Sequence, residues 1–148
     1  MNEFEVVNVE PVTLAAVRTS SRREDLSVTI PKASGPIWPF LRSKPETKPG
    51  LNVVVYLEGP KRMEVGVQVS AKPEPPAGII YTQTPSGLAA HGVHIGPYSE
   101  LGRTYEALHA WIAQNKLHMK GPFWEVYGHW NDDPQKLRTD IYFLVEKT

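Results

Sequence analysis

Val-rich and alternating segments open and close each half of the 148-residue chain, and they predict β-strands. The expected strands are residues 4–9, 14–19, 51–57 and 63–70 in the first half, and 79–83, 88–95, 123–130 and 139–145 in the second. Turn-forming residues at 58–61 and 131–134 separate the last two strands of each half. Each half is therefore expected to end in a pair of strands joined by a turn.

Between the opening and closing strands the hydrophobic period changes from two to that of a helix. In the second half one apolar stripe at helical spacing predicts a helix over about 99–116. The stripe consists of Leu101, Tyr105, Leu108 and Ile112. The corresponding segment of the first half, about 31–43, is interrupted by proline and predicts a shorter helix.

An internal repeat relates the two halves. The pattern Pro-x-x-Leu-Ala-Ala occurs at 11–16 and again at 85–90, and weaker echoes follow in the same order. The echoes pair 54–56 with 125–127, and 64–69 with 140–145. We therefore predict an α+β fold in a single domain over 1–148, made of two pseudo-symmetric strand-helix-strand-strand repeats, about 4–72 and 78–147. Such repeats would form an antiparallel sheet with helices on one side, leaving the other side or a cleft between the repeats for a ligand.

Charge and composition narrow the possible functions. The chain carries 16 Lys and Arg against 16 Asp and Glu, and this balance argues against direct nucleic-acid binding. Without cysteine it has no disulfide, no thiolate metal site and no cysteine nucleophile. No stretch is apolar enough to span a membrane and residues 1–15 do not form a signal peptide, so a soluble, cytoplasmic protein is expected. The histidine spacings fit no metal pair and no nucleotide-binding or serine-hydrolase motif is present, so neither a metal nor a cofactor is expected.

A segment near the end of the chain points most directly to a ligand. Read as a strand, it places Phe123, Glu125 and Tyr127 on one face, so two aromatic rings frame a carboxylate. Such a carboxylate is a good receptor for a lipophilic cation, because its charge and the ring quadrupoles both attract it. An equally weighted alternative is a glutamate on an edge strand that points to water. By the repeat correspondence, Val54 and Tyr56 take the places of Glu125 and Tyr127, so one wall of the pocket is expected to be apolar.

Two aromatic residues of the first half and one histidine of the second are further candidates. Trp38 and Phe40 lie in the Pro-rich part of the first half, where they could cover the mouth of a pocket, but a place in the core is favoured. His94, just before Gly96 and Pro97, is expected to form a hydrogen bond at the strand-helix junction rather than to catalyse. The candidate ligand-binding residues are Glu125, Tyr127, Phe123, Tyr56, Val54, Trp38, Phe40 and Tyr142.

Several motifs of the second half carry a resemblance to a known family. They are His94-x-Gly96-Pro97-Tyr98, Tyr105-x-x-Leu108-x-x-Trp111-Ile112, Gly121-Pro122-x-x-Glu125-Val126-Tyr127 and Asp140-Ile141-Tyr142. Together they resemble the GyrI-like family, the effector-binding domain of AraC-type and multidrug-responsive regulators, over about 4–146. The resemblance implies the two-repeat fold, a pocket between the repeats and a functional acidic residue at Glu125. Regulators of this family usually begin with a DNA-binding domain, whereas the first strand is expected at residue 4 here, so we expect a stand-alone member.

These observations predict non-catalytic binding of a hydrophobic, cationic small molecule in a pocket centred on Glu125. The expected setting is multidrug or toxin sensing or sequestration, linked to transcription regulation, in the cytoplasm of a bacterium. The resemblance leaves two alternatives open. Some stand-alone members are associated with hydrolysis of electrophilic cyclopropane-containing toxins, for which Glu125 could activate water with Tyr127 as its hydrogen-bond partner. The family name also implies a protein partner, DNA gyrase, and the sequence does not decide the oligomeric state.

Overall fold

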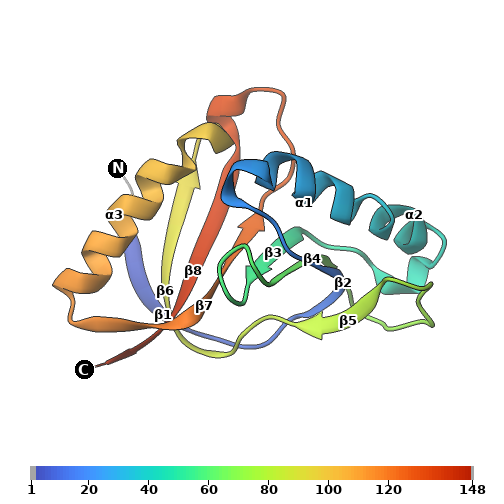
Figure 1. The fold of residues 1–148 in the computed structure, drawn as a ribbon, viewed down its shortest axis with the longest axis horizontal. Coiled ribbons are helices and arrows are strands. Elements are labelled where there is room, and N and C mark those ends of the chain that lie inside the picture. Colours follow the sequence, from blue (N-terminus) through green and yellow to red (C-terminus); the bar gives the residue numbers. More distant parts are fainter. Residues whose placement is uncertain (1–2, 148) are drawn as a thin grey trace. The chain divides into compact units, whose positions relative to one another are not determined.

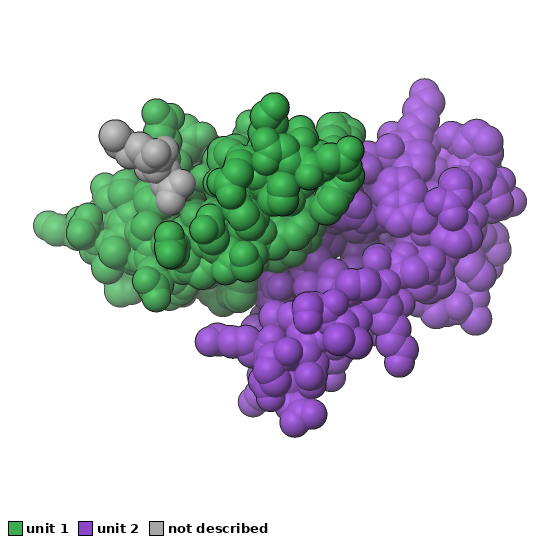
Figure 2. Space-filling model, turned by 90° about the horizontal axis from the view of Figure 1, so that it is seen from above, with its two compact units in different colours: residues 1–10, 85–148 green, residues 11–84 purple. Residues whose placement is uncertain are grey.

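The computed structural model describes residues 3–147, and the chain divides into two compact units (Figures 1 and 2). Unit 1 combines residues 1–10 with 85–148, and unit 2 is residues 11–84. Each unit consists of antiparallel strands with helices packed on one face, which confirms the predicted α+β class. In the described part of the chain, no helix is both long enough and apolar enough to cross a membrane.

Unit 1 is a layer of antiparallel strands covered on one face by a single long helix. Its strands, in spatial order, are β1 (Phe4–Val9), β6 (Gly87–Ile95), β8 (Arg138–Lys147) and β7 (Leu117–Tyr127). The helix is α3 (Leu101–Gln114), and short 3-10 turns are η3 (Tyr98–Glu100) and η4 (Pro134–Lys136) (Figure 1). The predicted apolar stripe is the side of α3 that packs against the strands, since Leu108 and Ile112 are buried in one cluster with Ile141 and Phe143.

Unit 2 has the same layer arrangement with two short helices in place of one. Its strands, in spatial order, are β3 (Asn52–Tyr56), β4 (Met63–Gln68), β2 (Thr13–Thr19) and β5 (Ile80–Gln83). The helices are α1 (Leu26–Ser34) and α2 (Ile37–Arg42), and the 3-10 turns are η1 (Arg23–Asp25) and η2 (Pro45–Thr47). The core cluster includes Ala15, Ile37, Phe40, Leu41 and Val67.

The helical segment of the first half differs from the prediction of one helix over 31–43. Helix α1 begins earlier than predicted, at Leu26, and Pro31 lies inside it rather than at its start. Proline lacks the N–H that would bond one turn back, so this position weakens the helix without ending it. The break comes at Gly35, and Pro36 then stands just before the first residue of α2.

The compact units do not coincide with the two sequence repeats, because each unit takes its outermost strand from the other repeat. Strand β1 pairs with β6 of the second repeat, and β5 pairs with β2 of the first. The chain passes from one unit to the other at Pro11 and at Pro85, the first residues of the two Pro-x-x-Leu-Ala-Ala segments. The repeated motif therefore marks the two crossings.

In the two Pro-x-x-Leu-Ala-Ala segments, residues that match in sequence face opposite sides of the strands. In unit 2, Ala15 faces the helices within the core cluster. Its sequence match, Ala89, lies outside the corresponding cluster of unit 1, where Ala90 takes the helix-facing position. A shift of one residue along a strand reverses the face of every side chain, so this match does not mark equivalent positions.

Close approach of strands β4 and β2 requires glycine at position 66. A Cβ added to Gly66 would lie 2.8 Å from the backbone oxygen of Ala15 and 3.1 Å from the Cβ of Ala16. We predict that Gly66→Ala lowers the free energy of unfolding by about 2 kcal/mol, because backbone atoms cannot move aside cheaply. Urea unfolding followed by circular dichroism measures this change.

Gly102→Ala is the matched control. It lies in α3 with no atom within 4 Å of an added Cβ, and alanine should stabilise the helix there by about 0.5 kcal/mol. A Gly66→Ala protein as stable as the wild type would contradict the close strand approach.

Candidate functional site

Glu125 is buried on the face of β7 that looks toward α3. It pairs across the strands with Ile141, a member of the α3-facing core, and the residue is 4% exposed. The alternative of a glutamate that points to water therefore does not describe this side chain. Between its pairings at Met119 and Phe123, β7 advances four residues while β8 advances two, and Gly121 adopts a φ of +118° within this bulge. A bulge of two extra residues keeps the alternation in phase, so Phe123, Glu125 and Tyr127 all face the helix.

Two tyrosine hydroxyls hold the carboxylate. Tyr105 of α3 donates to Oε2 of Glu125 over 2.5 Å, and Tyr127 of β7 donates to Oε1 over 2.5 Å. Hydrogen bonds donated to a carboxylate offset part of the cost of burying it. Each hydroxyl has one hydrogen, and both hydrogens are directed at Glu125.

Aromatic rings of unit 1 surround this group. The ring of Phe123 stacks on Phe143 at a centroid distance of 4.8 Å, and Tyr105 meets both rings edge-on at 5.9 Å. On the other side, Tyr98 meets Tyr127 edge-on at 5.5 Å. We call the set formed by Glu125, Tyr105, Tyr127, Phe123 and Tyr98 the Glu125 site.

Sequence reasoning placed three of these residues together and missed two. Phe123, Glu125 and Tyr127 share a face, as predicted from strand alternation. The helical stripe and a family motif both include Tyr105, and another family motif includes Tyr98, but neither pattern places these two residues beside Glu125. A signal for Tyr105 was present, because the hydroxyl of a tyrosine that packs in a core needs a hydrogen-bond partner.

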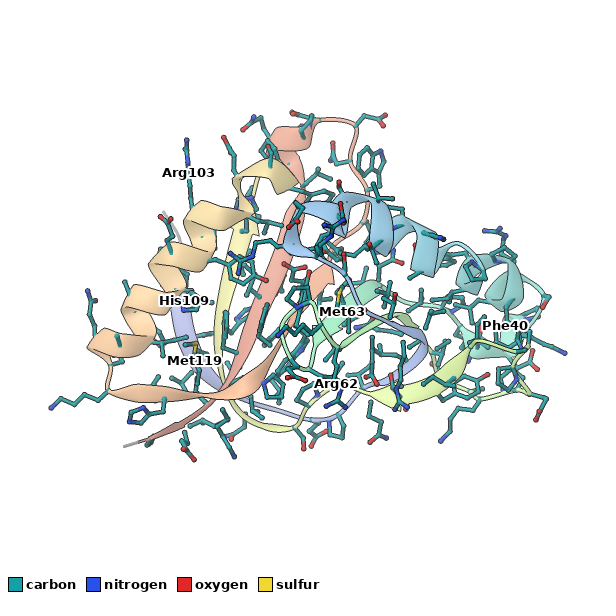
Figure 3. All side chains as sticks on the ribbon, in the orientation of Figure 1. Phe40, Arg62, Met63, Arg103, His109 and Met119 are labelled. Carbon is teal, nitrogen blue, oxygen red and sulfur yellow. The ribbon has the colours of Figure 1, made fainter. Side chains whose placement is uncertain are left out.

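Four of the candidate residues lie in unit 2. Val54 and Tyr56 on β3 are 1% and 5% exposed. Phe40 on α2, labelled in Figure 3, belongs to the core cluster of unit 2. Trp38 packs against that cluster while its Nε1 donates to Oδ1 of Asn52. The favoured interpretation of Trp38 and Phe40 as core residues therefore agrees with their contacts. An open surface hollow in unit 2 includes none of the candidates and is lined by Val12, Lys48, Gly50, Gln68, Val69 and Ser70.

The prediction that Tyr142 belongs with Glu125 is corrected by the strand register. Tyr142 pairs with Trp124, whereas Glu125 pairs with the adjacent Ile141, so Tyr142 lies on the opposite face of the strands. There its ring stacks between Trp124, at 5.2 Å, and His91, at 4.6 Å. Neighbouring residues in a strand point to opposite faces, so the adjacency of Tyr142 to Ile141 separates Tyr142 from Glu125.

A charged cluster surrounds His91 on this opposite face. Nε2 of His91 lies 2.8 Å from Asp140 and Nδ1 lies 3.3 Å from Glu5, while Arg138 donates to both oxygens of Asp140. The hydrogen bond to Asp140 raises the pKa of His91. Burial would raise the pKa of Asp140, but hydrogen bonds from His91 and Arg138 outweigh it and lower this pKa to about 2. Within residues 3–147 no group of three or more His, Asp or Glu is arranged to hold a metal.

These shifts predict how stability depends on pH. Protonated His91 stabilises the folded state fully below its unfolded pKa near 6.5, and this contribution is lost as pH rises through the raised folded pKa. Ionised Asp140 contributes above 3.8, and its contribution is lost as pH falls toward 2. We expect the wild type to lose about 1 kcal/mol more than His91→Gln between pH 5 and pH 9 in urea unfolding. Tyr142→Phe should keep the wild-type pH dependence, and equal slopes for wild type and His91→Gln would contradict the assignment.

Comparison with known proteins identifies the family and the fold. Residues 2–146 match the family model described as the GyrI-like small molecule binding domain. The C-terminal domain of EcmrR has a TM-score of 0.76 at 21% identity, and the match covers 100% of this chain and 99% of that domain. In the complex of EcmrR with DNA the TM-score is 0.82 at 18% identity, and this chain spans only 58% of the EcmrR chain.

Two further structures share the fold. SAV2435 bound to tetraphenylphosphonium has a TM-score of 0.65 at 15% identity, covering 97% of this chain and 94% of that one. A protein from Listeria innocua described as a hydrolase has a TM-score of 0.63 at 14% identity, covering 97% and 92%. No relative is found among curated protein sequences. Because the family model spans nearly the whole chain and the fold agrees with these structures, the protein belongs to the GyrI-like small-molecule-binding family.

Proposed function

We propose that this protein binds a hydrophobic cation at the Glu125 site without changing it chemically. The observation that carries the proposal is a buried carboxylate, held by two tyrosine hydroxyls and set among aromatic rings of unit 1. Family membership supports small-molecule binding in general. The chemistry around Glu125 supports the narrower class of ligand.

The electrostatics favour a cation that is weakly hydrated. Burying an ionised carboxylate is costly, so groups that carry or share positive charge are favoured beside it. A cation beside Glu125 would be attracted by the carboxylate and by the electron-rich aromatic rings of the site. A delocalised, lipophilic cation loses little hydration on entering such surroundings, whereas a small inorganic ion loses much. The fold shared with a protein bound to tetraphenylphosphonium supports testing that cation first.

Hydrolysis is the second candidate. The fold is shared with a protein described as a hydrolase, and a carboxylate beside a phenol can act as a general base. In that role Glu125 would accept the proton of a water molecule that attacks an electrophilic carbon, and Tyr127 would orient the carboxylate. Recovery of unchanged ligand favours binding, and recovery of a hydrated product favours hydrolysis.

Capture of the cation would serve sensing or sequestration. We place this role in the bacterial cytoplasm, as part of multidrug or toxin defence linked to transcription regulation. A formal net charge of zero supports a role without direct contact to nucleic acid, so a signal would pass through a protein partner.

Removing the charge of Glu125 while keeping its shape tests the proposal. We expect Glu125→Gln to weaken tetraphenylphosphonium binding by at least about tenfold, because the amide retains hydrogen bonds but not the negative charge. Binding of neutral triphenylphosphine oxide should change by less than about twofold. Isothermal titration calorimetry of both ligands measures these changes, and mass spectrometry of the recovered ligands detects turnover.

Glu64→Gln is the matched control, since Glu64 is also 4% exposed but lies in unit 2 with Arg18 as its ion-pair partner. It should leave both affinities unchanged. A Glu125→Gln protein that binds the cation as tightly as the wild type would refute the proposed role of the carboxylate.

A further inference from the structure

We infer that Tyr98 is the outer ring of the Glu125 site and selects cations that carry aryl groups, and that buried His94 is the residue that positions it. The inference rests on the proposed function, because it concerns which cations the same site prefers. It gives a role to the His94-x-Gly96-Pro97-Tyr98 motif.

The chain makes a sharp turn between β6 and α3, and Tyr98 stands on that turn. Gly96 adopts a φ of +131°, a conformation that favours glycine, and its N–H donates to the carbonyl of Leu137 over 2.8 Å. Pro97 follows, and its carbonyl accepts from the N–H of Glu100 over 3.0 Å. The 3-10 turn η3 therefore begins at Tyr98 from a fixed backbone.

Buried His94 forms hydrogen bonds to this turn and to α3. It is 5% exposed, its Nε2 lies 3.0 Å from the carbonyl oxygen of Pro97, and its Nδ1 lies 2.7 Å from the hydroxyl of Thr104 on α3. A carbonyl oxygen can only accept, so Nε2 carries the hydrogen and donates to Pro97. In the neutral ring Nδ1 then accepts from Thr104. One imidazole thus joins β6 to the turn and to the helix that supplies Tyr105.

Tyr98 occupies the boundary between the site and water. The residue is 38% exposed, and its ring meets the ring of Tyr127 edge-on at 5.5 Å, with an angle of 76° between the planes. Tyr127 in turn donates to Glu125. Tyr98 is therefore one ring removed from the carboxylate.

From this position Tyr98 is expected to discriminate between cations by their size and by the aromatic groups that they carry. Because Tyr98 is one ring removed from the carboxylate, we expect a compact alkylammonium beside Glu125 to leave Tyr98 uncovered, and the phenyl groups of an aryl cation to contact it. Contacts between aromatic rings add to affinity beyond simple burial of area. Replacing Tyr98 should therefore weaken binding of aryl cations more than binding of alkylammonium cations, and so change the ratio of the two affinities.

The test compares tetraphenylphosphonium, titrated directly, with tetraethylammonium, measured by competition, in variants of the full chain. We expect Tyr98→Ala to weaken tetraphenylphosphonium about tenfold and tetraethylammonium less than about twofold. Tyr98→Phe should keep the wild-type ratio, because the ring and not its hydroxyl makes the contact. Trp130→Ala removes another exposed aromatic residue of unit 1, 71% exposed, and should change neither affinity.

The positioning role of His94 has its own variants. His94→Leu removes both hydrogen bonds and should lower the affinity ratio in the same direction as Tyr98→Ala, whereas His94→Gln, whose amide can donate to Pro97, should restore most of it. Should His94→Leu not fold, Thr104→Val removes only the bond to Nδ1 and should shift the ratio less, in the same direction. A ratio that stays at the wild-type value in folded His94 and Thr104 variants would overturn this role.

The Glu125→Gln variant distinguishes failure of the proposed function from failure of the role inferred for Tyr98. If it weakens both cations while Tyr98→Ala leaves their ratio unchanged, the proposed function stands and the role of Tyr98 is overturned. If Glu125→Gln binds both cations like the wild type, or if the wild type binds neither, the proposed function fails and this inference fails with it.

Discussion

The pair of hydrogen bonds from Tyr105 and Tyr127 to Glu125 is the interaction on which the rest of the site depends. A carboxylate with 4% exposure needs compensation, and the fold supplies it from two different elements. Helix α3 must lie with its apolar stripe on the strands for Tyr105 to reach Glu125, and the bulge at Gly121 must keep β7 in phase for Tyr127 to do so. The two hydrogen bonds to Glu125 therefore form only when the helix and strands of unit 1 are packed as observed.

Strand alternation gives unit 1 two different faces. The face toward α3 carries Glu125 among rings, while the opposite face carries Asp140 with His91 and Arg138. Each carboxylate is compensated differently, since neutral phenols hold Glu125 and cationic side chains hold Asp140. The basic partners of Asp140 already balance its charge, so Asp140 offers little to a further cation. This balance argues against Asp140 as the centre of a cation site.

Local periodicity predicts much of this arrangement, and pairing over long distances does not follow from it. Alternation alone puts Phe123, Glu125 and Tyr127 together, and the helical stripe identifies the buried side of α3. A stripe does not say which strand residue lies opposite, so the bond between Tyr105 and Glu125 could not be predicted. The repeat suggests two similar units, but the exchange of β1 and β5 depends on pairing that no local pattern encodes. The period of β8 puts Tyr142 on the face opposite Ile141, so a motif that contains both residues does not place Tyr142 beside Glu125.

The most direct test of the central claim is the position of a bound cation in a crystal of the complex. Tetraphenylarsonium has the shape of tetraphenylphosphonium, and its arsenic atom gives an anomalous signal that locates the centre of the ion independently of any fitted structure. We expect one arsenic peak within about 6 Å of the Glu125 carboxylate, with a phenyl ring against Tyr98. An arsenic peak remote from Glu125, with the two tyrosine hydrogen bonds unchanged, would contradict this claim.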